Sequence, residues 1–172
     1  MERRIKVINL SDTLALPSYA TPGSAGMDLP ACFDNREKRI AKVYRRIGDI
    51  QELDLNVDTV ITMFPSERAL IPSNVKYELT EGSVALIPSR SGLSIKQGCI
   101  VVNSPGVVDE DYRGIVHICI INLGFKPVTI RHGDALAQMI VTSYDKVLWE
   151  EVDELSETER GSGGFGHTGV KR

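Results

Sequence analysis

Short, mostly apolar runs separated by turn residues constrain the fold of this chain more than any other feature of its sequence. Glycine, asparagine and aspartate mark the breaks, as in TEG (80–82), NLG (122–124) and HGD (132–134). The runs predict strands at residues 5–10, 69–71, 84–87, 100–102, 115–121, 128–130 and 136–141. Many short strands at close spacing indicate an all-β fold, either a jelly roll or a distorted barrel.

The run IVHICII (115–121) differs from the others because both of its faces are mostly apolar. A strand with this pattern is buried on two sides. The second side packs either in the core or against another subunit.

A charged segment from about residue 36 to residue 59 interrupts the strand pattern. Ile40, Val43, Tyr44 and Ile47 follow at spacings of 3, 4 and 7, which predicts one short amphipathic helix. Its basic side chains are Arg36, Lys38, Arg39, Lys42, Arg45 and Arg46. We expect this insertion to lie on the surface, either as a solvated helix or as a docking site for an unknown protein partner or nucleic acid.

Length, charge, apolar runs and cysteine spacing exclude several classes of protein. A chain of 172 residues fits one domain, and a net charge of -3 argues against a nucleic-acid footprint. Apolar runs are too short for a membrane span, and the apolar stretch near the start is too short for a signal peptide. Cys32, Cys99 and Cys119 have no zinc-like spacing and predict reduced thiols. We therefore expect a protein of a bacterial or viral-host cytoplasm that is not secreted and binds neither nucleic acid nor membrane.

The end of the chain has a different composition. Residues 151–160 are acidic, and five of the ten residues in RGSGGFGHTG (160–169) are glycine. So much glycine cannot hold a core strand or helix, which predicts a flexible arm. We expect a domain at residues 1–155 and an arm at residues 156–172.

Four segments carry side chains suited to chemistry on a phosphorylated ligand. TPGSAGMDL (21–29) places Asp28 after a tight bend, and SRSGLS (89–94) offers Arg90 and Ser91 to an anion. NSPGVVDEDYRG (103–114) holds Asp109, a candidate general base, and Tyr112, a flat face for a sugar or base. The glycine-rich segment adds a cation and an aromatic ring. Each of the first three segments, considered alone, also fits an ordinary turn. The glycine-rich segment, considered alone, also fits a linker.

Together with HGDALAQ (132–138), these segments resemble in order and spacing the five motifs of the trimeric dUTPase family, across residues 20–169. The resemblance implies a jelly-roll homotrimer that hydrolyses dUTP to dUMP and pyrophosphate with Mg²⁺. This reaction lowers dUTP and supplies dUMP for thymidylate synthesis. Each active site would take motifs from two subunits and the arm from the third.

The resemblance also implies residue roles. Asp109 activates the water that attacks the α-phosphorus, and Asp28 holds a water on the Mg²⁺, which the triphosphate chelates. Asn103 imitates a base-pairing partner for uracil in a hairpin that excludes thymine, and Tyr112 packs on the deoxyribose. The remaining binding residues are Gly106 and Val107 of the hairpin, Arg90, Ser91, Gly92 and Gln138 at the phosphates, and Arg160, Phe165, Gly166, His167 and Thr168 of the arm.

The chain departs from the family pattern at four places. Ala135 stands where the fourth motif usually has Arg, Ser89 precedes Arg90 where Pro is frequent, and His167 replaces a usual Ser. The insertion at residues 36–59 is the largest departure.

Two other functions remain compatible with the sequence. One is dCTP deaminase, which shares the fold, although Asp109 and the uracil hairpin follow the dUTPase pattern. The other is a nucleotide-sensing module that uses the insertion to hold a partner. Release of pyrophosphate from dUTP would separate an enzyme from a pure sensor.

Overall fold

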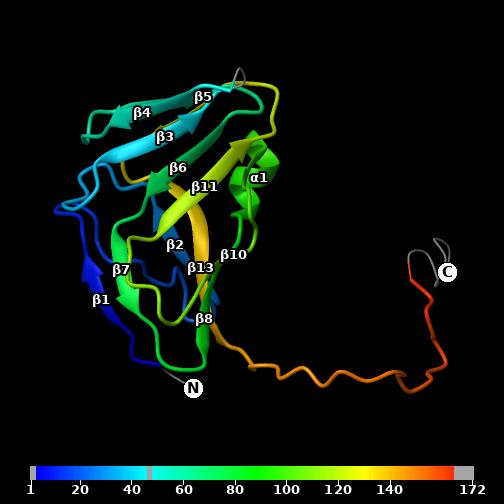
Figure 1. Cartoon of the computed structure of the whole chain (residues 1–172). Coiled ribbons are helices and arrows are strands. Elements are labelled where there is room, and N and C mark those ends of the chain that lie inside the picture. The colour runs from blue at the N-terminus through cyan, green and yellow to red at the C-terminus, as the bar shows by residue number, and fades with distance from the viewer. Residues whose placement is uncertain (1–2, 46–47, 165–172) are drawn as a thin grey trace.

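A computed structural model describes residues 3–45 and 48–164 of the chain (Figure 1). All seven predicted strands are present, and strands far outnumber helices among the elements of the described residues. The elements are β1 (Lys6–Asn9), β2 (Met27–Pro30), β3 (Ile40–Tyr44), β4 (Ile50–Asp54), β5 (Val60–Met63), β6 (Arg68–Pro72), β7 (Val75–Glu78), β8 (Ser83–Ile87), α1 (Ser91–Gln97), β9 (Cys99–Val101), β10 (Gly106–Val108), β11 (His117–Asn122), β12 (Val128–Arg131) and β13 (Ala135–Ser143).

Two larger sheets enclose the core. One has the strand order β10-β8-β13-β2 and the other β4-β3-β6-β11-β9, and the pairs β1-β7 and β12-β5 complete the fold. Apolar side chains from both sheets form one buried cluster, which includes Leu29 and Ile87 from the first sheet and Ile71 and Ile118 from the second. The predicted all-β class is confirmed, and the architecture is jelly-roll-like.

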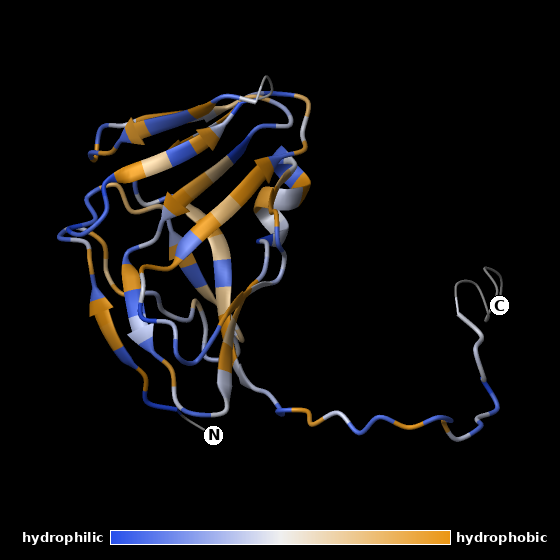
Figure 2. Ribbon diagram, viewed as in Figure 1, coloured by the Kyte–Doolittle hydropathy of each residue, from blue (hydrophilic) through white to orange (hydrophobic). Residues whose placement is uncertain are grey.

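Alternating burial along the strands explains this packing. β8 and β11 bury every second residue. The alternation is one of burial, because Figure 2 shows β11 as hydrophobic along most of its length. On β11, Ile118 and Ile120 are fully buried, whereas His117 and Cys119 on the other face are half-buried. A core on both faces of β11 is therefore excluded, and the subunit contact remains the open alternative.

The predicted helix within residues 36–59 is wrong, because this segment forms the antiparallel hairpin β3–β4. Its turn contains Gly48 at φ +89°, a conformation that glycine adopts without strain. Ala41 and Val43 are 0% exposed. The two lie on one face of a strand, and this period of two was concealed by the helical spacing of the larger apolar residues.

The hairpin is built into the second sheet. β3 pairs with β6 on the side opposite β4, so it is an internal strand. Arg45, expected on a solvated helix face, donates to the buried Glu67 carboxylate at 2.6 Å and to the Thr62 carbonyl at 3.0 Å. A basic side chain of this segment thus stabilises the fold.

Deleting residues 36–59 is therefore expected to prevent folding. The deletion removes Val43 and Leu55 from the core, and burial of each such side chain contributes about 1.5–3 kcal/mol. Typical domains are stable by about 5–15 kcal/mol in total. Circular dichroism and thermal unfolding of the deletion product would measure the loss.

The matched control changes an exposed residue of the same hairpin. Glu52→Gln removes a surface ion pair with Lys42 and should leave the melting temperature nearly unchanged. A folded deletion product with the parent melting temperature would contradict the integral role of the hairpin.

After β13 the chain leaves the body of the molecule. Residues 144–162 are exposed and run away from the two sheets (Figure 1). Over residues 3–45 and 48–164, no helix has the length and apolar character needed to cross a membrane.

Candidate active site

Asp28 and Arg90, from the first two predicted motifs, meet directly. Asp28 lies on β2, and Arg90 lies between the end of β8 and the start of α1. Arg90 donates from Nε and Nη2 to the two Asp28 carboxylate oxygens, both at 2.9 Å. The side chains are 32% and 45% exposed, so this bidentate pair faces solvent on one side.

The fourth motif joins the same cluster. β13 pairs with β2 so that Gln138 lies opposite Asp28. Arg90 also donates from Nη1 to the Ala135 carbonyl at 2.9 Å. Ala135, which departs from the expected pattern of the fourth motif, therefore contributes a backbone acceptor to Arg90. Motifs one, two and four form one site surface within a single chain.

Ser91 and Gly92 begin α1, a helix that sequence reasoning placed in a loop. Both residues are exposed. The helix ends at Gly98, whose φ is +70° and where a Cβ would lie 2.5 Å from the Gly124 amide nitrogen. This close approach requires glycine and fixes the length of α1.

The loop between β9 and β10 forms a second cluster. The Asn103 side chain lies against Gly106, where a Cβ would be 3.3 Å from Asn103 Nδ2. The Ser104–Pro105 peptide bond between them is cis. A small pocket of about 70 Å³ lies here, lined by Ile87, Val101, Asn103, Gly106, Val107, Val108, His117, Ile118 and Cys119. Three predicted uracil-binding residues thus share one pocket.

His117 is a lining residue that sequence reasoning did not assign. Burial lowers the pKa of its imidazole, which favours the neutral ring. Nδ1 lies 2.9 Å from the Ile115 carbonyl and donates to it in this form. A lone histidine in a strand gave no sequence signal for this position.

Asp109 and Tyr112 lie in the turn after β10. The Tyr112 amide donates to the Asp109 carbonyl at 3.2 Å, and the Tyr112 hydroxyl donates to the Ile115 carbonyl at 3.0 Å. A Cβ at Gly114 would lie 2.4 Å from that hydroxyl, so a larger residue there would displace the Tyr112 ring. Asp109 is exposed, and among the described residues no group hydrogen-bonds to its carboxylate.

Glu110, which the sequence showed only as an acid beside Asp109, ties this turn to two other segments. Its carboxylate accepts hydrogen bonds from the Gly82 amide, in the β7–β8 turn, and from Lys146, which follows β13. The Gly82 N–H, and next the Lys146 ammonium, hold the pKa of Glu110 below its ordinary value. Glu110 therefore braces the turn that carries Asp109.

This pKa shift has a definite consequence for stability. A lowered folded-state pKa adds stability above the ordinary glutamate pKa, and that stability is lost as the pH falls through the folded value. Glu110→Gln should therefore be less stable than the parent at neutral pH, and the difference should shrink below about pH 4. Urea unfolding across this range would measure it.

The control for this variant is Glu81→Gln, at an exposed acid adjacent to Gly82. It should change stability little at any pH. A Glu110→Gln effect of equal size at low and neutral pH would argue against the ionised contact.

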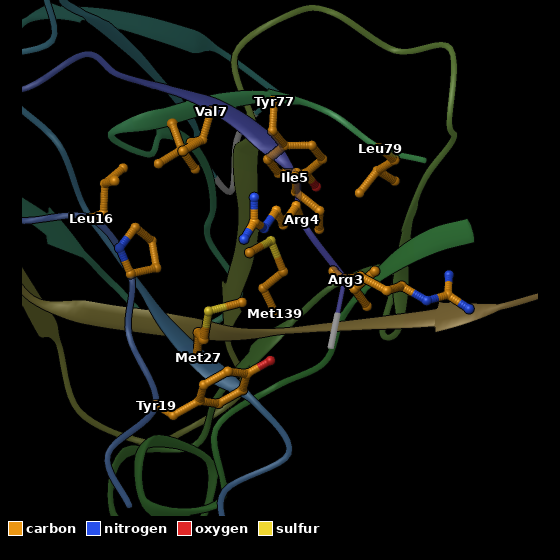
Figure 3. A pocket seen from close by; sticks show the side chains of 13 residues that line it. Arg3, Arg4, Ile5, Val7, Leu16, Tyr19, Met27, Tyr77, Leu79 and Met139 are labelled. Atoms are coloured by element: carbon orange, nitrogen blue, oxygen red, sulfur yellow. The ribbon is translucent and has the colours of Figure 1, made fainter. Parts of the chain in front are cut away.

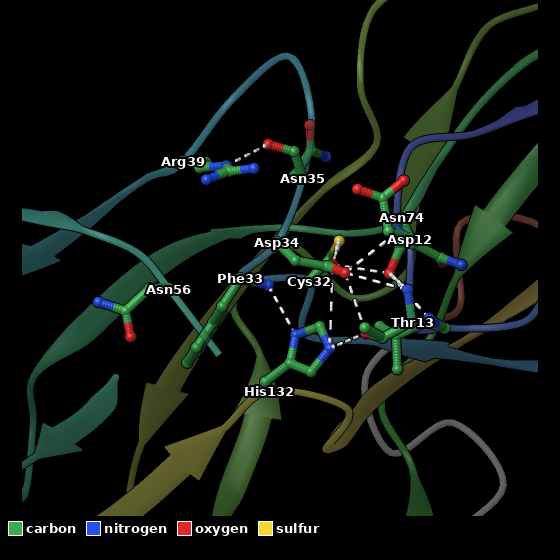
Figure 4. A network of polar contacts seen from close by, with 12 residues as sticks. Asp12, Thr13, Cys32, Phe33, Asp34, Asn35, Arg39, Asn56, Asn74 and His132 are labelled. Carbon is green, nitrogen blue, oxygen red and sulfur yellow. Dashed lines mark hydrogen bonds and ion pairs between the residues drawn. The ribbon is translucent and has the colours of Figure 1, made fainter. Parts of the chain in front are cut away.

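A buried polar network holds the fourth motif in place (Figure 4). Asp34 accepts hydrogen bonds from the Ser11 hydroxyl at 2.6 Å and the Thr13 hydroxyl at 2.9 Å. The Cys32 thiol donates to the same carboxylate at 3.3 Å. Burial opposes ionisation of Asp34, but these hydrogen bonds outweigh it and hold the pKa well below its usual range. The charged carboxylate thus anchors the chain before β2.

His132 connects this network to the turn before β13. The Phe33 amide donates to His132 Nδ1 at 3.0 Å, so the proton of the neutral ring lies on Nε2, 2.8 Å from the Thr13 hydroxyl. That hydroxyl donates to Asp34 and has no base to activate it. The arrangement is structural rather than a nucleophilic triad.

Cys32 and Cys99 are buried thiols of the core, and neither forms a disulfide in the described structure. Burial, followed by the Asp34 contact, raises the pKa of Cys32 to about 12, and burial raises that of Cys99 to about 11. Both remain protonated and unreactive at neutral pH.

Arg160, the predicted arm residue that the structure describes, joins neither cluster. Arg160 is exposed and donates to the Gly163 carbonyl at 2.9 Å, within the tail itself. The predicted residues Phe165, Gly166, His167 and Thr168 lie outside the described residues. Over the described part of the chain, no group of three or more His, Cys, Asp or Glu is placed to hold a metal ion.

Comparison with known proteins defines the class. The dUTPase family profile matches residues 51–169. A deoxyuridine 5'-triphosphate nucleotidohydrolase of Desulfotalea psychrophila is 40% identical over 174 residues, covering 99% of this chain and all of that protein.

Two solved phage structures share the fold. A mutant dUTPase of Staphylococcus bacteriophage 80alpha with dUpNHpp has a TM-score of 0.75 at 22% identity, covering 98% of this chain and 100% of that one. A mutant dUTPase of phage phi11 of S. aureus, described for the coordination of a structural Mg(II) ion, has a TM-score of 0.66 at 21% identity. It covers 88% of this chain and 98% of that one.

Fold, motif order and sequence similarity all point to one class, the nucleotide hydrolases with a jelly-roll-like fold. The chain belongs to the dUTPase family. It is accordingly an enzyme, a deoxyuridine triphosphate nucleotidohydrolase.

Proposed function

We propose that this enzyme splits dUTP into dUMP and pyrophosphate by Mg²⁺-dependent attack of water on the α-phosphorus, with Asp109 as general base. The observation that carries the proposal is the Asp109 turn: an exposed carboxylate without a protein partner among the described residues, on a backbone braced by Glu110. A carboxylate held this way can take a proton from water as the water attacks.

The loop at Asn103 supports recognition of the nucleobase. Its amide side chain can both donate and accept hydrogen bonds, which matches the edge of uracil. The narrow pocket beside Gly106 and Val107 supports exclusion of a bulkier base. Tyr112, 44% exposed, offers its ring to the deoxyribose.

The cluster around Arg90 supports binding of the triphosphate. A guanidinium has five N–H donors, and three are engaged with Asp28 and Ala135. About two donors therefore remain for phosphate oxygens. Ser91, Gly92 and Gln138 complete this phosphate-binding surface.

The residues present fit a Mg²⁺ ion held mainly by the substrate. Each Asp28 oxygen accepts one hydrogen bond from Arg90 and keeps further capacity for a water. Asp28 would hold the ion through such a water, as hard cations that retain several waters allow. Bound Mg²⁺ supplies neutralisation of the triphosphate charge.

The arm closes the proposed site. Arg160 and Thr168 would contact phosphates, Phe165 would stack on uracil, and the amides of Gly166 and His167 would approach the remaining oxygens. The exposure of Arg160 supports this role, since its guanidinium is committed within the tail to a single carbonyl.

We further propose that the enzyme is a homotrimer. The half-buried outer face of β11, with Cys119 and Ile121, supports packing against another chain. The tail supports it as well: Leu148 is 95% exposed and Trp149 is 94% exposed, which water disfavours unless another surface covers them.

An apolar pocket of about 560 Å³ offers such a surface (Figure 3). Met27, Met139 and Leu79 line it together with Arg3 and Arg4. The acidic tail of residues 150–159 complements these arginines in charge. In this proposal, residues 144–155, the last part of the domain of residues 1–155, pack on a neighbour's surface, and residues 156–172 form the arm.

The proposed function predicts a simple substrate ranking. Pyrophosphate release should be fast with dUTP and lower by at least about 10²-fold in kcat/KM with dTTP, dCTP or UTP. The assay measures pyrophosphate with Mg²⁺ and with excess EDTA, where turnover should fall. Deamination of dCTP, or equal rates on dTTP, would contradict the proposal.

A further inference from the structure

We infer that Ser89 is a positioning residue that sets nucleobase selectivity by holding the Asn103 loop. Ser89 lies next to Arg90 but has no assigned role in the reaction. The inference rests on the proposed function, in which Asn103 reads the uracil edge.

The Ser89 hydroxyl contacts both sides of Asn103. It accepts a hydrogen bond from the Val101 amide at 2.8 Å and lies 3.4 Å from the Ser104 hydroxyl, to which it donates. The Ser89 amide also donates to the Ser104 hydroxyl, at 3.3 Å. Asn103 is thus bracketed by two residues that one side chain holds.

Ser89 is itself fixed from the opposite side. It forms an isolated bridge with Ala137 of β13, and the neighbouring Pro88 carbonyl accepts the Gln138 amide at 3.0 Å. Besides the pairing of β10 with β8, the Ser89 hydroxyl and amide therefore connect the Asn103 loop to the strands that carry the phosphate-binding cluster.

The hydrogen bond from the Val101 amide makes the Ser89 hydroxyl important for the position of the loop. Val101 is 2% exposed, so its amide loses its partner without gaining full access to water when the hydroxyl is removed. An unsatisfied buried donor is costly, and the loop would shift to relieve it.

Ser89→Ala is therefore expected to raise KM for dUTP about 5- to 10-fold with kcat within about twofold. The ratio of kcat/KM for dUTP over dTTP should fall about tenfold, because a displaced Asn103 reads the base less well. Inhibition by inorganic imidodiphosphate, which probes the phosphate surface alone, should stay within about twofold.

Three variants make the test specific. Ser89→Thr keeps the hydroxyl and should restore the parent ratio. Ser104→Ala removes one partner and should shift the ratio less, in the same direction. Ser94→Ala removes a hydroxyl that bonds to the Arg90 carbonyl and does not reach the loop, and should leave the ratio unchanged.

Asn103→Ala separates the two proposals. If it lowers the dUTP preference while Ser89→Ala lowers only the melting temperature, Ser89 has a merely structural role and the inference is overturned. If Asn103→Ala leaves the preference intact, the proposed base reading fails and the inference falls with it.

Discussion

Asp109→Asn is expected to lower kcat by about 10³-fold while binding of a non-hydrolysable dUTP analogue stays within about tenfold. The amide keeps the shape of the side chain but cannot accept a proton from water. Single-turnover kinetics and calorimetric titration with the analogue would separate the two effects.

Asp111→Asn is the matched control, because Asp111 is exposed in the same turn and its replacement changes the net charge equally. It should retain most of the parent rate. An unchanged kcat in Asp109→Asn would remove Asp109 from the role of base, whatever the control shows.

Ending the chain at Glu159 is expected to remove most of kcat/KM at almost unchanged thermal stability. Residues 160–162 are exposed and Gly163 and Gly164 carry no side chain, so these five contribute little to the core. Ordering the arm over bound nucleotide would exclude water and align the reacting groups. Loss of the Phe165 stack alone should cost about 1–3 kcal/mol, which is about 5- to 150-fold.

The same truncation tests whether the arm acts on another subunit. Truncated chains and Asp109→Asn chains are each expected to be nearly inactive. If the enzyme is the proposed trimer and the arm acts on a neighbour, mixed trimers should regain activity after joint unfolding and refolding, because one chain would supply Asp109 and another the arm. Mixtures that remain inactive would show that both groups act within one chain. A truncated enzyme with the full rate would show that the arm has no role in catalysis.

The strands and the motif positions could be predicted because both are local signals. The short apolar runs of β8 and β11, each followed by turn residues, indicate a strand without knowledge of its partner. The hairpin at residues 36–59 was misread because Ile40, Val43 and Tyr44 fit a helical period as well. In the structure, β3 pairs with β6, and Ala41 and Val43 are buried in the core. Both contacts join residues that are distant in the sequence.

The contacts that position the site residues could not be predicted either, because they also join residues distant in the sequence. Asp28 and Arg90 are 62 residues apart in sequence, and Gly82 and Glu110 are 28 apart. Ser89 and Glu110 resemble ordinary turn residues until the fold brings their partners to them. Motif matching finds groups that contact substrate, whereas the residues that hold those groups emerge from tertiary structure.

The position of β4 has a consequence for behaviour at high concentration. β4 forms one edge of the five-stranded sheet, and an uncovered edge is a template for strand addition by another molecule. Glu52 and Asp54 are exposed on this strand. Because like charges would meet whenever two such edges approach, these acids protect the enzyme against edge-to-edge aggregation.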